Sequence, residues 1–435
     1  MTKKLLFIIV VVLNGIKLFA YDFSAACTTI GKNNIEYRNS QTIYYNITDS
    51  VKRTVEVTYR TFDKKYELGL SDYAEWIEIP STVEYKGTLY TITAIGDYAM
   101  NDCCLGRPMY KEPSFYKRIE HINNKLASEG ISLTQQEIEA IHSDDFSDYN
   151  TLSNSREYCI GITSITIPAT VTRIGRAAFK GCSNMKVIYG GSAVTQIGDY
   201  AFEDCSELYE CLVSKSLKVI GNGAYSGCTN IRRAFIGDSV LSIGEGAFAY
   251  CYNLTELMHT SSVEEVCNIA FLQCFNLEKI DVPSIKSIGG AAFHHCHMLK
   301  SFNFSDSIYF IGEGAFSYSG LTSVRIPKLI NRINYSFDDC PNLETVFIPS
   351  TVTYFFRSFF DCPNLKSVTC EAVEPPSSLD GAFYFYQCME GPCIPDYISK
   401  VKLYVPCNSI EMYKTYRSWN GFGEYLPIPS SCKEK

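Results

Sequence analysis

The chain has 435 residues, of which 46% are apolar and 14% aromatic, a composition that supports a folded core and excludes a disordered chain. The formal net charge is −8, and no dense run of Lys and Arg occurs after the first residues, which excludes a nucleic-acid-binding protein. Length alone would suggest two or three domains, but the internal repeat described below predicts one continuous unit.

Residues 1–20 have the pattern of a secretory signal peptide. Two lysines precede an apolar run at 5–13, and Ala20 offers a small residue for cleavage. The run is too short to span a bilayer, and no other stretch is long enough. We therefore expect an exported protein, secreted or held at the surface of a bacterium, with cleavage near Ala20 and no transmembrane helix in the mature chain.

Residues 21–88 are predicted to form a β-rich cap. The segments 42–47 and 54–59 alternate in polarity and are rich in β-branched residues, as strands are. A cap is expected because the first coil of a solenoid would otherwise expose its core and an open strand edge. Residues 89–103 then read as a first repeat.

Residues 104–160 interrupt the repeat and are predicted to be an insertion with a short helix at 135–141, preceded by a capping box that begins at Thr134. The acidic residues Asp144, Asp145 and Asp148 suit a solvated loop better than a cation site. Insertions into a solenoid emerge as loops on one face, often the binding face.

A repeat of 21–23 residues occupies 161–373, and its clearest mark is an aromatic residue followed three positions later by Cys. Within each copy the pattern is Leu-x-x-Ile-x-Ile-Pro, then Val-x-x-Ile-Gly, then Ala-Phe-x-x-Cys. The first part predicts a short strand that ends at the proline, and the glycine suits a turn with unusual backbone angles. A sustained period of this length predicts a β-rich solenoid of 22–23-residue coils. The aromatic positions are Phe179, Phe202, Tyr225, Phe248, Phe271, Phe293, Phe316, Phe337 and Phe359.

This phrase resembles the BspA-like leucine-rich repeat family of bacterial surface proteins, over about two thirds of the chain. The lead-in at 43–59 and the ending at 403–419 resemble the same family. The resemblance implies a leucine-rich solenoid that acts in adhesion or recognition at the cell surface, with no catalysis.

The 19 cysteines of an exported chain would ordinarily suggest disulfides. Eight of them, however, occupy the same position of the repeat in different coils, and in one coil Ser319 occupies that position instead of Cys. If these cysteines formed disulfides, a lone Ser would leave one cysteine without a partner. If they are small buried side chains that fill the core, Ser is a mild change. We therefore expect reduced, packed thiols. Off-register cysteines are better disulfide candidates: Cys388 with Cys393, and Cys103, Cys104 or Cys159 around the insertion.

Residues 374–435 are predicted to hold the last coil and a C-terminal cap. Leu403 to Pro406 read as a final strand, and residues 409–416 as a short helix with Trp419 packed behind it. The whole architecture is therefore a β-rich solenoid between an N-terminal β-rich cap and a C-terminal strand–helix cap.

Motifs for catalysis are absent, and we assign no catalytic residue, cofactor or metal. The histidines at 294, 295 and 297 flank a cysteine that should point inward, which disfavours a shared metal. His259 falls at an inward strand position and reads as a core histidine. The acidic pairs 264–265 and 338–339 read as solvated surface, because adjacent side chains diverge and neither pair lies in an evident cleft.

The strand positions that the repeat leaves free indicate a binding surface. The third and fifth residues of each strand should face outward, and four consecutive fifth positions are apolar. Such a strip marks a partner surface, unless the cap or insertion covers it or it only stabilises the strand ladder. The predicted partner-binding residues are Tyr189, Leu212, Phe235 and Met258, flanked by Glu210 and Arg233.

The sequence thus predicts a secreted or surface-displayed leucine-rich repeat adhesin or recognition protein whose partners are host matrix or cell-surface proteins. The alternative is a glycan-binding or envelope-scaffolding protein that holds polysaccharide on aromatic side chains. The low count of tryptophan, two against 31 tyrosines and 26 phenylalanines, disfavours that alternative.

Overall fold

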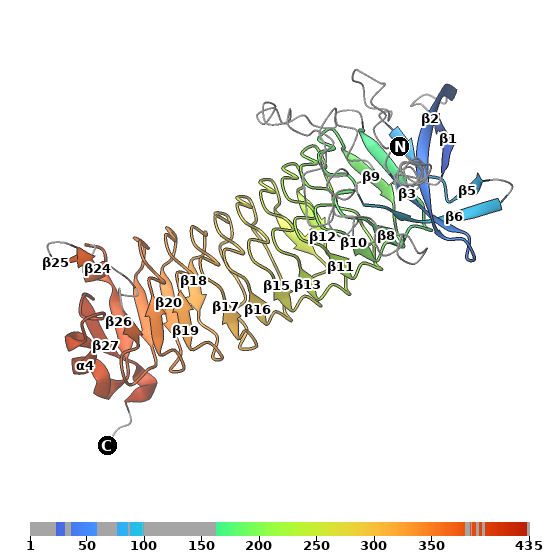
Figure 1. Ribbon diagram of the computed structural model, residues 1–435. Helices are drawn as coiled ribbons and strands as arrows, with labels where there is room; N and C mark the ends of the chain where they lie inside the picture. The colour runs from blue at the N-terminus through green and yellow to red at the C-terminus, as the bar shows by residue number, and fades with distance from the viewer. Residues whose placement is uncertain are drawn as a thin grey trace, which may run out of the picture.

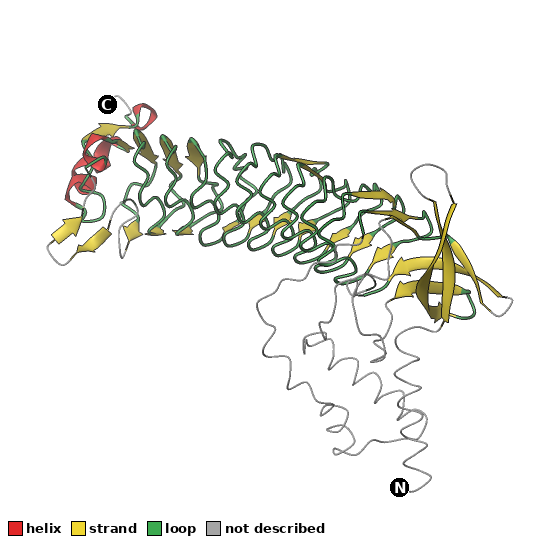
Figure 2. Ribbon diagram, turned by 90° about the horizontal axis from the view of Figure 1, so that it is seen from above, coloured by secondary structure: helices red, strands yellow, loops and turns green. Residues whose placement is uncertain are grey.

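The computed structural model describes residues 23–30, 36–58, 76–85, 88–97, 99, 162–378, 383, 385–388, 391–393 and 396–432. The chain winds into a β-solenoid of about 11 turns of about 23 residues each, which confirms the predicted fold class. Figures 1 and 2 show the turns stacked into a rod, with the N-terminal strands at one end and a short helix at the other. The predicted signal peptide and the insertion at 104–160 lie outside the described residues.

Ten coils follow one another in the described range 162–378, and we number them from the residue that opens each strand. The opening residues are Ile162, Met185, Leu208, Ile231, Leu254, Leu277, Leu299, Leu321, Leu343 and Leu365. Every one of them is buried, as the first position of the repeat requires. Each coil runs along two sides of the rod, as short strands in most coils, and closes through the turn that carries the aromatic residue and the Cys or Ser.

One side of the rod, here called the strand face, is built from the first part of each repeat. All its strands pair in parallel, with residues one repeat apart side by side, such as Ile165 beside Ile188. The strands form three sheets, in the orders β4–β7–β9, β12–β14 and β18–β20–β22–β26–β27. Their bounds are β4 (Trp76–Glu78), β7 (Ser164–Ile167), β9 (Val187–Gly190), β12 (Arg233–Phe235), β14 (Glu256–Met258), β18 (Ser323–Arg325), β20 (Thr345–Ile348), β22 (Ser367–Cys370), β26 (Lys402–Val405) and β27 (Glu424–Pro427).

A second side carries the Val-x-x-Ile part of each repeat as two- or three-residue parallel strands. Buried isoleucines stack along it, for example Ile174 beside Ile197 and Ile197 beside Ile220. The strands are β8 (Arg173–Ile174), β10 (Gln196–Ile197), β11 (Val219–Ile220), β13 (Ser242–Ile243), β15 (Glu265–Val266), β16 (Ser287–Ile288) and β17 (Phe310–Ile311), followed by a separate sheet of β19 (Arg332–Asn334), β21 (Tyr354–Phe356) and β23 (Ser377–Ser378).

Strands from before the insertion continue both sides of the rod. β4 pairs with β7, which places Ile77 beside Ile165. On the second side β6 pairs with β8, and β1, β2 and β3 extend that sheet beyond it. The first edge of the repeat ladder is therefore covered by paired strands. Their bounds are β1 (Phe23–Ile30), β2 (Glu36–Asp49), β3 (Thr54–Thr58), β5 (Thr82–Tyr85), which pairs with β6, and β6 (Thr88–Ile95).

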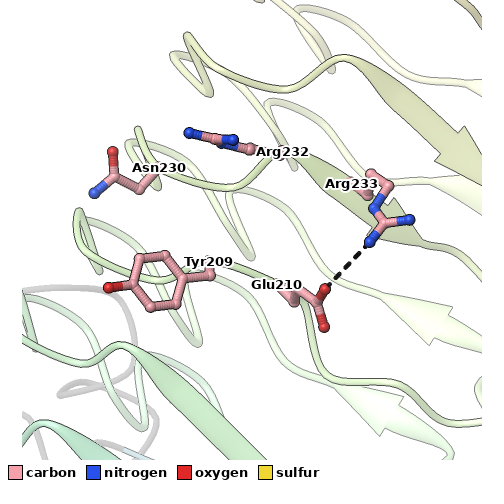
Figure 3. A pocket seen from close by; sticks show the side chains of 5 residues that line it. All are labelled: Tyr209, Glu210, Asn230, Arg232 and Arg233. Carbon is pink, nitrogen blue, oxygen red and sulfur yellow. Dashed lines mark ion pairs between the residues drawn. The ribbon is translucent and has the colours of Figure 1, made fainter.

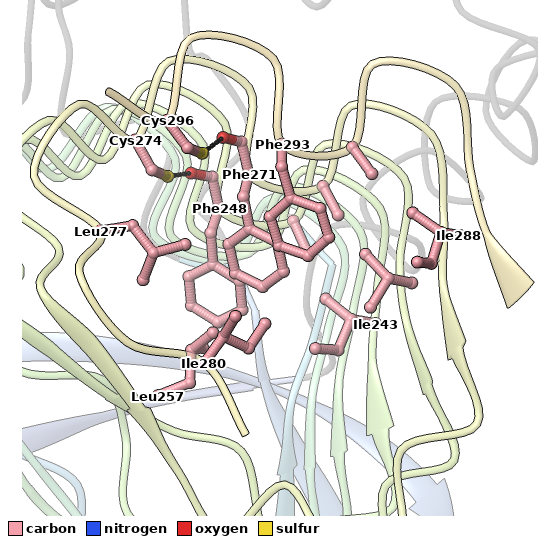
Figure 4. Packing of buried hydrophobic residues seen from close by; sticks show 14 of the residues in the cluster. Ile243, Phe248, Leu257, Phe271, Cys274, Leu277, Ile280, Ile288, Phe293 and Cys296 are labelled. Carbon is pink, nitrogen blue, oxygen red and sulfur yellow. Dashed lines mark hydrogen bonds between the residues drawn. The ribbon is translucent and has the colours of Figure 1, made fainter. Parts of the chain in front are cut away.

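The core contains one continuous stack of aromatic rings, part of which Figure 4 shows. Consecutive rings from Phe179 to Phe359 are 5.1–5.6 Å apart between centroids and nearly parallel. Phe383, which the repeat pattern did not reveal, adds a tenth ring at 5.3 Å. Offset stacking of this kind adds to the free energy gained from burial, so the aromatic slot joins each coil to the next.

The eight cysteines of the repeat are buried thiols, not disulfides. Seven of them donate an S–H bond to the carbonyl oxygen of the aromatic residue one coil earlier, at Sγ–O distances of 3.0–3.5 Å. Burial raises the pKa of Cys228 to about 11. The cysteine of the repeat therefore donates a hydrogen bond between coils, and it also fills space in the core as the sequence predicted.

The repeated glycine has a different role from the one predicted. At Gly175, Gly198, Gly221, Gly244, Gly289 and Gly312 the backbone angle φ is not positive. Instead, a Cβ at each of these positions would overlap backbone atoms of the preceding turn. The glycine is needed for close approach of the coils. Positive φ occurs two residues later, as at Ala177, Tyr200 and Gly223.

Backbone pairing is interrupted around coil 7. No named strand covers its first part, residues 299–305, and coil 6 before it has only an isolated bridge at Lys279, so β14 and β18 belong to different sheets. On the second side β17 does not pair with β19. Within the described range 162–378, coils 7 and 8 are joined by backbone bonds of the turns, such as Phe316 N–H to Ser336 O at 2.8 Å, by the bond from Thr322 N–H to Lys300 O at 3.1 Å on the strand face, and by the stacked rings Phe316 and Phe337. We call this interruption the seam.

The C-terminal end closes the core with a small aromatic cluster. Trp419 is fully buried, donates its indole N–H to Pro376 O at 2.9 Å and packs against Tyr413 of the short helix. A disulfide between Cys407 and Cys432, which sequence reasoning missed, ties this segment together. The side chains of Cys388 and Cys393 lie outside the described residues. The remaining elements are β24 (Phe385–Cys388), β25 (Gly391–Cys393), η3 (Ile398–Lys400), η4 (Cys407–Ser409), α4 (Ile410–Thr415) and η5 (Pro429–Ser431).

Candidate functional site

The predicted apolar strip lies on the strand face of coils 2–5, but it is not continuously exposed. Tyr189 in β9 is 50% exposed, and Met258 in β14 is half-buried. Leu212 and Phe235 are only 1% and 8% exposed. The expectation that all four fifth positions face outward is therefore wrong for Leu212 and Phe235.

Leu212 turns inward because coil 3 departs from the strand pattern. The hydroxyl of Tyr225 accepts the backbone N–H of Leu212 at 3.2 Å, a contact that no Phe in this slot could make. Leu212 is buried beside Cys211, whose position is also buried in other coils, as at Ile165 and Ala234, and Val213 faces outward with 51% of its surface exposed. The alternation of inward and outward side chains thus slips by one residue.

Phe235 is covered in part by an imidazole from the next coil. The ring of His259 lies 4.4 Å from that of Phe235, centroid to centroid. His259 itself is exposed, with positive φ and its Nδ1 3.1 Å from Asp238 Oδ1. The prediction of a core histidine at this position is therefore wrong, because the chain has already left the inward-facing strand there.

The two charged residues predicted to flank the strip do lie together, in a hollow of about 360 Å³ that Figure 3 shows. Glu210 and Arg233 occupy adjacent positions of coils 3 and 4 and form an ion pair at 3.7 Å. Tyr209, Asn230 and Arg232 complete the lining. We call this the strand-face hollow.

Sequence reasoning missed Tyr209, Asn230 and Arg232 because it considered only the third and fifth strand positions. Tyr209 and Arg232 share the second position of coils 3 and 4, and Tyr209 is 49% exposed. Among the described residues no carboxylate lies within ion-pair distance of Arg232. The hollow thus offers an aromatic ring, an amide and a guanidinium to a partner.

The other polar clusters give no arrangement for catalysis. In the described part of the chain no group of three or more His, Cys, Asp or Glu side chains could hold a metal ion. Glu264 forms a solvated ion pair with Lys286 at 2.7 Å. Asp338, by contrast, is largely buried, so the prediction of solvated surface is wrong there. Burial and the neighbouring Asp339 carboxylate raise the pKa of Asp338 to about 8.

The chain is thus a repeat solenoid with a hollow on its strand face, the architecture of a leucine-rich repeat protein. The sequence matches the BspA type leucine rich repeat region, in six copies, over residues 150–278 and 264–390. These residues make up more than half of the chain, which therefore belongs to the BspA type leucine-rich repeat family. Proteins of this fold are generally non-catalytic, and membership fits a recognition or binding role.

Several solved structures are similar to the chain. A leucine-rich repeat protein from Bacteroides ovatus is 19% identical, with 90% of this chain and 88% of that chain covered and a TM-score of 0.49. A leucine rich cell surface protein from Faecalibacterium prausnitzii is 20% identical, with coverage of 92% and 98% and a TM-score of 0.47. The pneumococcal vaccine antigen PcpA is 13% identical, with coverage of 89% and 97% and a TM-score of 0.33. No curated protein sequence matches this chain.

Proposed function

We propose that this is a secreted or surface-displayed bacterial recognition protein that binds another protein, such as a host matrix or cell-surface protein, through its strand face. The leader-like pattern of residues 1–20 supports export, and among the described residues no helix is long and apolar enough to cross a membrane. The observation that carries the proposal is the strand-face hollow, with the exposed Tyr209 and with Arg232, which pairs with no carboxylate of the described residues.

The composition of the hollow favours a protein partner. Tyrosine and arginine are the residues that most often dominate the binding energy of protein interfaces. The paired charges of Glu210 and Arg233 beside them would fix the orientation of a partner more than they would add affinity. Tyr189 extends the same face one coil further toward the N-terminus.

The test is capture of matrix proteins and glycans by the mature protein, compared with a Tyr209→Ala/Arg232→Glu variant. Both substituted side chains lie at the surface, so we expect folding to be retained and capture of a protein to fall at least tenfold. Lys300→Glu is the matched control, since Lys300 occupies the second strand position of coil 7 and is exposed. Circular dichroism checks the fold of both variants.

Two results would count against the proposal. Protein capture that is equal in the hollow variant and in the control would place recognition elsewhere on the chain. Capture of glycans alone would favour the glycan-binding or envelope-scaffolding alternative.

A further inference from the structure

The turn after the aromatic residue is shortened in coil 7. Other coils place two residues between the Cys slot and the Leu that opens the next strand, but here Gly320 alone separates Ser319 from Leu321. A Cβ at Gly320 would overlap the carbonyl oxygen of His297 in coil 6, so the chain passes directly against its neighbour. The slot that the neighbouring coils fill with a side chain is therefore empty.

A notch of about 250 Å³ occupies this place on the turn edge of coils 6–9. It is separate from the strand-face hollow, which involves coils 3 and 4. We call it the turn notch. Its lining residues are His297, Tyr318, Asp339, Pro341, Asp361 and Pro363.

One wall of the turn notch is the exposed imidazole ring of His297. Tyr252, Phe275 and His297 stack one coil after another, with centroids 5.1 and 5.2 Å apart and ring planes within 13° of parallel. The stack covers the face of His297 that looks toward coil 5. His295 lies at right angles to this ring, with its Nδ1 3.2 Å from Nε2 of His297. In coil 7 the position that would continue the stack is Gly320, which has no side chain.

The opposite wall and the rim carry negative charge. Tyr318, stacked on His295 at 4.4 Å, donates its hydroxyl to the Asp339 carboxylate. Burial and, to a smaller extent, the nearby Asp361 carboxylate raise the pKa of Asp339. No Lys or Arg lines the turn notch.

We propose that the turn notch binds the guanidinium group of an arginine side chain presented by a partner protein. A guanidinium is planar, stacks on a ring face and donates to carboxylates in a fork, which is the combination that His297, Asp339 and Asp361 offer. A bound guanidinium would also relieve the repulsion between the two carboxylates. A metal ion is a poorer occupant, because no described cluster supplies three ligands. This proposal does not depend on the strand-face hollow.

The experiment is an NMR titration of the mature protein with the peptide acetyl-Gly-Arg-Gly-amide, followed through the imidazole ring signals. The chain has only six histidines, which makes these signals easy to separate. We expect the signals of His295 and His297 to shift, with an affinity at least tenfold higher than for the same peptide carrying uncharged citrulline. Added salt should weaken the binding.

The variant Asp339→Asn/Asp361→Asn should abolish the shift. Asparagine keeps the hydrogen-bond acceptor for Tyr318 and tolerates the positive φ of both positions. Asp204→Asn is the matched control, since it has the same slot and a positive φ in coil 2, far from the turn notch. If the double variant fails to fold, the single Asp361→Asn variant at the exposed rim replaces it.

Equal affinity for the arginine and citrulline peptides would overturn the proposal, as would shifts that persist in the folded Asp variant. The absence of any shift at millimolar peptide would also overturn it. Since none of these outcomes involves the strand face, the proposed function stands or falls separately.

Discussion

At the scale of single residues, the fold depends on glycines, whose lack of a Cβ lets neighbouring coils approach closely. The glycine of the second part of each repeat allows two backbones to approach more closely than any side chain would permit. The residue that follows this glycine in the sequence can carry a side chain without such an overlap. Coil 6 has both situations side by side, at Gly289 and Gly290.

Gly289→Ala should destabilise the protein by about 2–3 kcal/mol, because its Cβ would overlap the backbone at Cys267 and Asn268. Gly290→Ala is the matched control: its Cβ would approach no closer than 3.3 Å to Glu313 O, and φ is not positive. We expect a change of less than about 1 kcal/mol there, aided by the lower entropy of the unfolded alanine chain. Urea unfolding measures both, and equal losses would contradict the close-approach argument.

Asp338 makes stability depend on pH. Its pKa is about 8 in the folded protein and near 3.8 when unfolded, because burial and Asp339 outweigh the favourable Arg357. The folded state therefore binds the extra proton between these values, and stability falls as pH rises from about 4 to 8. Asp338→Asn removes this loss, so it should stabilise by roughly 1–3 kcal/mol at pH 9 and by almost nothing at pH 3.5. Unfolding curves at the two pH values test this, with the exposed Glu371→Gln as reference. A benefit that is equal at both would contradict it.

At the scale of the coil, one hydroxyl changes the course of a strand. The Tyr225 ring replaces phenylalanine in the stack without altering it, at 5.1 and 5.4 Å from its neighbours. Its hydroxyl, however, accepts the backbone N–H of Leu212, and the Leu212 side chain is buried where the repeat predicts an outward one. This contact lies in coil 3, which has no named strand on the strand face between β9 and β12.

Tyr225→Phe should cost about 1–3 kcal/mol, because the Leu212 amide would lose its buried acceptor. Hydrogen exchange at Leu212 should speed up, while exchange in coils 6–10 should not change. A stability within about 0.5 kcal/mol of the parent would show that the coil-3 backbone does not depend on this bond.

How far the sequence could predict the structure is clear from these cases. The parallel strands, the ring stack and the reduced thiols follow from period and polarity, which neighbouring coils share. The inward orientation of Leu212 depends on a contact with Tyr225, thirteen residues away. A pattern derived from all coils does not contain a contact that occurs in one coil. The turn notch was visible only as a shorter spacing after Phe316 and a Ser in the Cys slot. Phe383 and the Cys407–Cys432 disulfide lie beyond the regular repeat, where periodicity gives no guide.

At the scale of the whole molecule, stability is a sum of coil-to-coil terms, since each coil contacts only its neighbours. The last coil has a neighbour on one side only, so local unfolding should begin at the C-terminal end unless other contacts stabilise it. Trp419 and the Cys407–Cys432 disulfide hold it.

Replacing Cys407 and Cys432 together by Ser should therefore lower stability locally. The bridge spans 25 residues of sequence, for which chain entropy suggests about 3 kcal/mol. We expect faster hydrogen exchange in β26, β27 and coil 10, with coils 1–5 unchanged. Cys267→Ser, at a half-buried thiol, is the control. A uniform increase in exchange along the rod would contradict the nearest-neighbour description.

The seam at coil 7 has a mechanical consequence. A rod pulled at its ends bears the same force at every coil boundary and parts where the fewest bonds share it. Coils 7 and 8 lack paired strands on both sides, so the fracture should fall there and leave two shorter rods, each still stacked. The turn notch straddles that boundary, with His297 on one side and Asp339 and Asp361 on the other. A ligand bound in the turn notch would contact both sides of this boundary and would therefore raise the force needed to separate coils 7 and 8.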